Sequence, residues 1–193
     1  MTFAGAVLAG GSSRRMGRDK AFITVDGVEM VISVVRALND AGASSVTAIG
    51  GDEARLGALA LDRVPDRFPG DGPLGGIITA LEHTVTARSS ADRVVTLACD
   101  LLSPSPQAVR EIVAVLDDDS IDVAVPVVDG ISQWLHTAWR THALESLTAA
   151  FGRGIRAPRL ALAGLRVAEI EAGDRTWFQD ADRPEDLPSG NVE

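Results

Sequence analysis

The stretch FAGAVLAGGSSRRMGRDKA, residues 3–21, joins a strand pattern to a cationic loop. Its first six residues are apolar or small, which is typical of a buried strand. Residues 10–20 then contain three glycines, three arginines and a lysine. A glycine-rich turn lets backbone N–H groups approach a phosphate, and cationic side chains add charge-assisted hydrogen bonds. We therefore predict a loop that receives a triphosphate; the alternative is a surface turn with scattered basic residues.

The remainder of the chain alternates between strand and helix patterns. Apolar runs that predict strands cover residues 3–10, 44–51, 93–100, 122–128, 134–140 and 165–171. Helical patterns cover residues 28–42, 75–88, 105–119 and 141–154. This alternation predicts an α/β fold, a three-layer, doubly wound and mostly parallel sheet with helices on both faces. Ligands of such sheets bind at the carboxyl ends of the strands, so the loop at 10–20, Asp66 and Asp100 are expected at one edge.

Three of the helices carry more detailed expectations. The helix at 75–88 is expected to bury one apolar stripe, formed by Ile77, Ile78, Leu81 and Val85. Ser105 is the expected N-cap of the next helix, because its hydroxyl accepts hydrogen bonds from the first turn. His142 is expected to cap the helix at 141–154.

The composition is that of a soluble globular protein. Of 193 residues, 46% are hydrophobic and 23% are charged, which predicts a single domain over 1–187 with a flexible tail at 188–193. A net charge of -9 and a pI near 4.8 argue against a nucleic-acid partner. No apolar run approaches the roughly 18–20 residues of a membrane span. The single cysteine, Cys99, and a start without a basic leader predict a cytoplasmic location.

Two standard phosphate-binding motifs do not fit the first loop. The Walker A pattern needs a serine or threonine after its lysine, whereas Lys20 is followed by Ala21. The dinucleotide fingerprint G-x-G-x-x-G is not matched by GGSSRRMG at 10–17. An NAD-dependent reductase is therefore excluded, because that class depends on this fingerprint.

Five blocks of sequence occur in order and are spread over nearly the whole chain. The first is LAGGSSRRMGRDKA at 8–21, and the others are PDRFPGDGPLGGI (65–77), ACDLLSP (98–104), QWLHTAWR (133–140) and FQDADRPEDL (178–187). Together they resemble the MobA-like nucleotidyltransferase family. The chain departs from the family pattern in several places: Gly50 and Gly51 replace an asparagine, Gly70 and Asp71 are added, Leu102 replaces a proline, and Asp180 and Asp182 replace asparagines.

The resemblance implies a fold and a reaction. The implied fold is the Rossmann-like fold of the nucleotide-diphospho-sugar transferases. The implied reaction transfers GMP from Mg·GTP to the phosphate of a molybdopterin-type cofactor and releases pyrophosphate. It also implies transient contact with proteins that deliver the cofactor or with apo-molybdoenzymes.

The choice of base rests on LAGG at 8–11, which the resemblance associates with guanylyl transfer, whereas LAAG is associated with cytidylyl transfer. Gly10 leaves room for the edge of a purine. Three alternatives stay open: cytidylyl transfer to the same cofactor, guanylyl transfer to another small phosphorylated acceptor, and a non-catalytic nucleotide-binding regulator.

The resemblance carries roles to individual residues. Nucleotide contacts fall to Leu8, Ala9, Gly10, Gly11, Lys20, Asp66 and Asp100. Catalytic roles fall to Lys20 and Arg15, since cationic groups stabilise the charge on departing pyrophosphate, and to Asp100 through Mg²⁺. The alternative roles are structural: Asp100 capping the turn that follows it, and Asp66 capping its own loop.

Mg²⁺ is the expected cofactor, because it prefers carboxylate oxygens, few protein ligands and substrate phosphates. Asp100, at the end of an apolar strand, meets this description, and Asp182 is expected to complete the site. The alternative for Asp182 is an N-cap for residues 183–187. Asp19 is expected either to orient Lys20 or to cap the segment that follows.

The histidines, tryptophans and remaining arginines give weaker signals. His136 could face the acceptor, although plain packing is the commoner role of such a residue. Trp134 is a candidate for stacking on a pterin, against a core role. Three arginines could meet a phosphorylated acceptor or lie on a solvated face: Arg153, Arg156 and Arg159.

Overall fold

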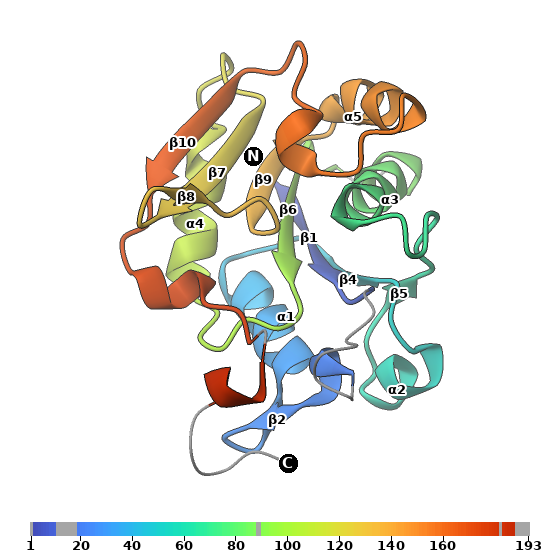
Figure 1. Ribbon diagram of the computed structural model, residues 1–193, viewed down its shortest axis with the longest axis vertical. Coiled ribbons are helices and arrows are strands. Elements are labelled where there is room, and N and C mark those ends of the chain that lie inside the picture. The colour runs from blue at the N-terminus through green and yellow to red at the C-terminus, as the bar shows by residue number, and fades with distance from the viewer. Residues whose placement is uncertain (1, 11–18, 88–89, 182, 188–193) are drawn as a thin grey trace.

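An eight-stranded sheet runs through the centre of the protein (Figure 1). The computed structural model describes residues 2–10, 19–87, 90–181 and 183–187. Its strands are β1 (Phe3–Leu8), β4 (Val46–Ile49), β5 (Arg63–Val64), β6 (Arg93–Ala98), β7 (Val123–Val128), β8 (Ile131–Ser132), β9 (Thr137–Arg140) and β10 (Val167–Glu171). A separate hairpin pairs β2 (Thr24–Val25) with β3 (Val28–Glu29).

Helices separate most of these strands. The α-helices are α1 (Met30–Asp40), α2 (Glu53–Ala58), α3 (Pro73–Thr86), α4 (Pro106–Val115) and α5 (Ala143–Gly152). Short 3₁₀ helices are η1 (Lys20–Phe22), η2 (Pro158–Leu160), η3 (Arg175–Phe178) and η4 (Pro184–Asp186). Among the described residues, no helix combines the length and apolar character needed to cross a membrane.

The sheet is mostly parallel, which confirms the predicted fold class. Its order is β10-β7-β9-β6-β1-β4-β5, with β8 beside β7. β1 pairs in parallel with both β4 and β6, while β9 lies antiparallel between β6 and β7. The reversal starts at the turn Asp129-Gly130, where both residues have positive φ, as a tight hairpin requires.

All six predicted strands are shorter in the structure, and at β9 a turn is the cause. β9 begins at Thr137, whereas the expected strand begins at Trp134. The backbone N–H of His136 donates to the carbonyl of Gln133 at 2.9 Å, so this segment forms a turn before it joins the sheet. The two-residue strands β2, β3, β5 and β8 and the helix α2 were not predicted, because two residues or less than two helical turns leave no periodic pattern.

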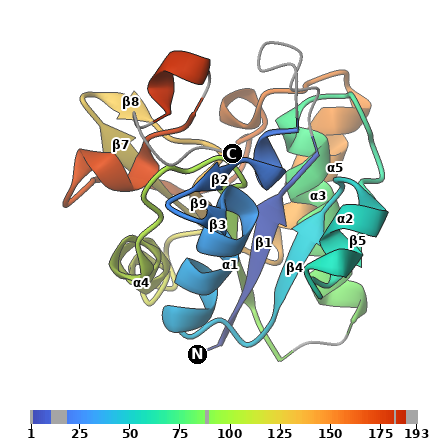
Figure 2. The same cartoon turned by 90° about the horizontal axis from the view of Figure 1, so that it is seen from below.

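Two apolar cores lie on opposite faces of the sheet. Figure 2 shows α1 and α4 on one face and α3 and α5 on the other. On the first face, Val7 of β1 packs in the same cluster as Val34 and Leu38 of α1. On the second face, the cluster joins Leu81 of α3 with Trp139 of β9. Helices on both faces make the three layers that the sequence predicts.

The expected stripe of α3 ends one turn earlier than predicted. Ile77, Ile78 and Leu81 are buried, but Val85 is 50% exposed. Val85 precedes the last residue of the helix, where the chain leaves the packed layer. Ser105 caps α4 as expected, its hydroxyl accepting from the backbone N–H groups of Gln107 and Ala108.

His142 does not cap α5 with its side chain, contrary to expectation. Its Nε2 instead lies 2.9 Å from Oδ1 of Asp122, a buried carboxylate. Arg166 donates to the same carboxylate through its backbone N–H at 2.8 Å, its Nε at 3.0 Å and its Nη2 at 2.7 Å. These hydrogen bonds hold the pKa of Asp122 well below its usual range. The carboxylate therefore joins the starts of β7, α5 and β10.

Replacing Asp122 with asparagine tests this junction. Asp122→Asn is expected to lower the free energy of unfolding by about 1–3 kcal/mol at neutral pH, because hydrogen bonds to a charged acceptor are lost. A depressed pKa adds stability that is complete above the unfolded value of about 3.9 and is lost as pH falls towards the folded pKa. Urea unfolding at about pH 7 and about pH 3 should therefore show a smaller difference between variant and wild type at the lower pH. A difference that does not change with pH would contradict this account.

Candidate active site

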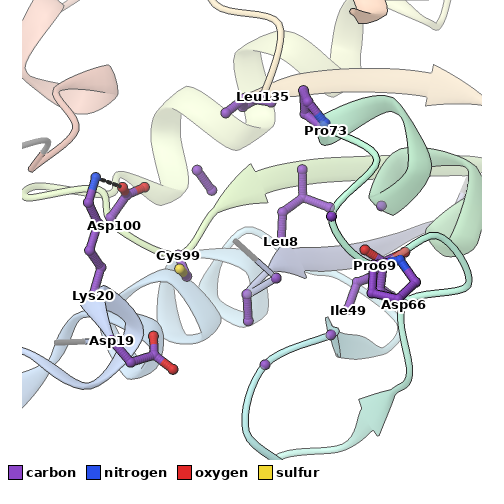
Figure 3. A pocket seen from close by; sticks show the side chains of 18 of the residues that line it. Leu8, Asp19, Lys20, Ile49, Asp66, Pro69, Pro73, Cys99, Asp100 and Leu135 are labelled. Atoms are coloured by element: carbon purple, nitrogen blue, oxygen red, sulfur yellow. Dashed lines mark hydrogen bonds and ion pairs between the residues drawn. The ribbon is translucent and has the colours of Figure 1, made fainter. Parts of the chain in front are cut away.

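A pocket of about 950 Å³ opens at the carboxyl ends of β1, β4 and β6. Its lining comes from the loops that follow β1, β4, β5 and β6 and from the start of α3. In Figure 3, Lys20 and Asp100 lie at one end of this pocket, while Asp66 and Pro69 lie at the other. A pocket of this size at this edge is the usual ligand site of an open parallel sheet.

Lys20 and Asp100 form an ion pair across the pocket's first end. Nζ of Lys20 donates to Oδ2 of Asp100 at 2.9 Å, and each side chain is 15% exposed. Asp100 follows β6, and Lys20 is the first residue of η1. Asp19 caps η1 by accepting from the backbone N–H of Ala21 at 3.1 Å, so the capping alternative for Asp19 is the observed one.

The pKa of the Asp100 carboxyl is raised above its ordinary value. Burial is the main cause, and the negative charge of Asp180 is the second. The hydrogen bond and positive charge of Lys20 oppose both effects. Asp100 is thus a carboxylate whose charged form gains from a nearby cation.

The backbone around Asp100 is held by a segment near the end of the chain. The N–H of Ala181 donates to the carbonyl of Asp100 at 2.9 Å, and the N–H of Leu102 donates to the carbonyl of Gln179 at 3.0 Å. Leu101 and Asp180 form an antiparallel bridge between these bonds. Residues 100–102 are therefore fixed by pairing with the tail motif.

The imidazole of His136 joins this segment to β6 through two hydrogen bonds. The imidazole is 1% exposed and its Nδ1 accepts from the backbone N–H of Ala98 at 3.4 Å. Nε2 therefore carries the proton and donates to Oδ1 of Asp180 at 3.1 Å. His136 is buried and lies outside the pocket lining, so packing, and not contact with an acceptor, is its observed role.

The other end of the pocket is formed by Gly10, Gly50, Gly51 and Asp66. Oδ1 of Asp66 accepts from the backbone N–H of Phe68 at 3.0 Å and from the hydroxyl of Thr79 at 3.3 Å. Oδ2 points instead towards Gly10, 3.5 Å from where a Cβ on that residue would lie. Asp66 thus caps its loop with one oxygen and presents the other to the pocket.

Gly50 and Gly51 both have φ of +74°, a conformation that favours glycine. A Cβ on Gly50 would lie 3.0 Å from Cα of Gly10, so the two loops meet backbone to backbone. Arg63, on β5, donates through Nε to the carbonyls of Gly50 at 3.0 Å and Gly51 at 3.1 Å. The sequence analysis did not identify Arg63, since a lone arginine in a two-residue strand gives no motif.

The structure brings most of the predicted site residues into one pocket. The lining includes Leu8, Ala9, Gly10, Lys20, Asp66 and Asp100. Gly11, Arg15 and Asp182 lie outside the described residues. Within the described ranges, no group of three or more His, Cys, Asp or Glu side chains is arranged to hold a metal. Asp100 is the described residue whose carboxylate fits a Mg²⁺ that takes its other ligands from phosphate.

Cys99 and Arg156 have structural roles in the described residues. Cys99 is buried, and burial raises the pKa of its thiol far above the ordinary value, so the thiol is inert core. The guanidinium of Arg156 stacks on Phe151 at 3.9 Å and donates to the carbonyl of Phe151 at 2.8 Å.

The fold and the pocket together define an α/β protein of the doubly wound kind, with a pocket at the carboxyl edge of its sheet and paired charges at one end of that pocket. Comparison with known proteins narrows this class. The profile described as "MobA-like NTP transferase domain" matches residues 5–167. The chain belongs to the MobA-like NTP transferase family.

Individual relatives agree with this assignment. A molybdenum cofactor guanylyltransferase of Bradyrhizobium sp. is 30% identical over 95% of this chain and 89% of that protein. A probable molybdenum cofactor guanylyltransferase of Opitutus terrae is 44% identical, but the match spans only 51% of this chain and 48% of that protein. The crystal structure of molybdopterin-guanine dinucleotide biosynthesis protein A from Archaeoglobus fulgidus shares the fold, with a TM-score of 0.78, 22% identity and coverage of 95% and 94% of the two chains.

The charge of Asp180 gives a test of the electrostatics at Asp100. Asp180→Asn keeps an oxygen that accepts from His136 but removes a negative charge, so the pKa of Asp100 is expected to fall. Carbon-13 NMR of the aspartate carboxyl groups should show the Asp100 resonance titrating at lower pH in the variant. Glu169→Gln, on the distant strand β10, is the control and should leave that titration unchanged. An Asp100 titration that moves upward in Asp180→Asn would contradict the assigned cause.

Proposed function

We propose that this protein transfers GMP from Mg·GTP to the phosphate of a molybdopterin-type cofactor and releases pyrophosphate. The observation that carries the proposal is the 2.9 Å pair of Lys20 and Asp100 at one end of a pocket whose other end is glycine-lined. The names of the relatives, molybdenum cofactor guanylyltransferases, support the same reaction. The acceptor is proposed from those names, because no described residue by itself identifies a pterin.

The two ends of the pocket differ in chemical character, and this difference suits a nucleoside triphosphate. Lys20 and Asp100 supply charge at the first end, which suits the triphosphate and its metal. Gly10 and the free oxygen of Asp66 lie at the second end, which suits the nucleoside, whose N–H and O–H groups donate to a carboxylate. We assign Leu8, Ala9 and Gly10 to backbone contacts with the nucleotide and propose the same role for Gly11.

The reaction needs no covalent intermediate on the protein. An anionic oxygen of the acceptor phosphate attacks the α-phosphorus of GTP, the new P–O bond forms, and the bond to the bridging α–β oxygen breaks. The electron pair of that bond leaves with pyrophosphate. The ammonium of Lys20 stabilises the charge that develops on pyrophosphate, and Arg15 is proposed to assist it.

Asp100 fits a magnesium ion by its chemistry. Its carboxylate is part-buried at the pocket and its charged form gains from a cation. Bound there, Mg²⁺ would neutralise phosphate charge and lower the barrier to displacement. Asp182 is the proposed second ligand, which would hold the ion together with Asp100.

The cysteine content and the proposed product bear on the cellular setting. A lone buried cysteine suits a reducing compartment, so we propose the cytoplasm. Because the proposed product must reach an apo-molybdoenzyme, transient contact with such enzymes or with proteins that deliver the cofactor is part of the proposal.

The identity of the nucleotide is tested by thermal shift. With Mg²⁺ present, GTP is expected to raise the melting temperature, because a ligand that binds the folded state stabilises it. CTP at the same concentration should have little effect, and ATP serves as the purine control. Stabilisation by CTP and not by GTP would favour cytidylyl transfer instead.

The roles of Lys20 and Asp100 are tested by turnover. Asp100→Asn should reduce Mg²⁺-dependent pyrophosphate release by at least about a hundredfold, because it removes the carboxylate that would hold Mg²⁺. Lys20→Met should reduce it to a similar degree, because it removes the positive charge that stabilises departing pyrophosphate. Circular dichroism of each variant checks the fold. Near-full activity of either variant would refute its role, and normal GTP binding without pyrophosphate release by the wild type would favour a regulator.

A further inference from the structure

Arg63 holds the glycine turn at the nucleoside end of the pocket. Its Nε donates to two consecutive carbonyls, those of Gly50 and Gly51, and its side chain is 20% exposed at the pocket wall. The same guanidinium contacts Glu53 through Nη1 at 3.3 Å, but Glu53 is 85% exposed. An exposed pair of this kind contributes little, so the carbonyl contacts define the position of Arg63.

The turn is held from two sides. On one side, two consecutive residues with φ of +74° place both carbonyls within reach of one Nε. On the other side the turn packs against the first loop and α2: a Cβ on Gly51 would lie 3.1 Å from Cβ of Ala9 in the loop and 2.9 Å from Cδ1 of Leu56 in α2. Arg63 and the loop after β1 therefore hold the turn between them.

This arrangement fixes the width of the pocket at one end. Gly50 lies against Gly10, and Oδ2 of Asp66 faces Gly10 next to it. A shift of the turn would change the space beside Gly10 and the approach to Asp66. Lys20 and Asp100 lie at the opposite end, so a shift of the turn would leave the phosphate end in place.

We propose that Arg63 is a positioning residue for the nucleoside of the bound nucleotide, acting through the backbone of Gly50 and Gly51. The proposal rests on the proposed function, because it takes the ligand to be a nucleoside triphosphate. Arg63 sets affinity for the base and ribose and has no part in holding the triphosphate.

The experiment compares two ligands that share the phosphate end. Isothermal titration calorimetry measures binding of Mg·GTP and of Mg·tripolyphosphate to wild type, Arg63→Met and Arg63→Lys. Arg63→Met should raise the Kd and the KM for GTP about tenfold, with kcat changed by less than about twofold. The Kd for tripolyphosphate should not change. Arg63→Lys keeps a charge and donors without the planar fork and should recover part of the affinity.

Glu53→Gln is the matched control, because it removes the exposed partner of Arg63 and leaves the carbonyl contacts. It should bind both ligands as the wild type does. Equal affinity of Arg63→Met and wild type for GTP would overturn the proposal, and so would equal weakening for GTP and tripolyphosphate. If Arg63→Met does not fold, Arg63→Lys decides by the same comparison, and unfolding of both variants would overturn the proposal by making Arg63 a general stability residue.

The proposed function fails separately from this inference. A wild-type protein that binds Mg·GTP but releases no pyrophosphate with the acceptor contradicts guanylyl transfer. The binding comparison between GTP and tripolyphosphate then still decides the role of Arg63.

Discussion

The parallel register of β1 and β6 is the constraint on which the site depends. Leu8 pairs with Ala98 at the end of both strands, so the two loops leave the sheet at the same level. Side chains alternate between two cores: Val7 belongs to one and Ala6 to the other. A slip of one residue would exchange the faces of an entire strand, and both cores resist it. The register therefore brings the start of the first loop and the loop bearing Asp100 to one level at the pocket.

Charge balance connects this pair to the proposed reaction. Asp100 is part-buried, its pKa is raised by burial and by Asp180, and Lys20 supplies the compensating charge. A magnesium–triphosphate complex brings an anion for Lys20 and a cation for Asp100 at the same time. Lys20 and Asp100 can each exchange the other for an opposite charge on this complex. Neither is then left as an unpaired charge in a part-buried position, which would cost free energy. Without nucleotide, Lys20 and Asp100 neutralise each other. When the proposed complex binds, Lys20 would pair with the triphosphate and Asp100 with the magnesium ion.

Much of this fold, and part of its site, could be predicted from the sequence. Regular alternation of apolar runs predicted the parallel sheet, and the glycines and charges of the first loop, with Asp100 after a strand, predicted residues that the structure brings into one pocket. Features that depend on contact between distant segments were missed: Arg63 acts through two carbonyls and carries no motif, and His142 bonds to Asp122 across the sheet edge. Val85 fits the helical period but lies where packing has ended. Periodicity predicts which face a residue occupies, not where the neighbouring layer stops.

The pairing of residues 179–181 with 100–102 has a consequence for synthesis of the chain. The strands and helices that form both cores are complete by Glu171, but the loop bearing Asp100 gains its backbone partners only after Ala181 has been added. During synthesis, the residues that form both cores are therefore made before the residues that hold the loop of Asp100. Pairing across a loop of roughly eighty residues costs little entropy when the sheet already holds both ends near each other. The position of Asp100 thus depends on a segment that contributes to neither of the two large cores.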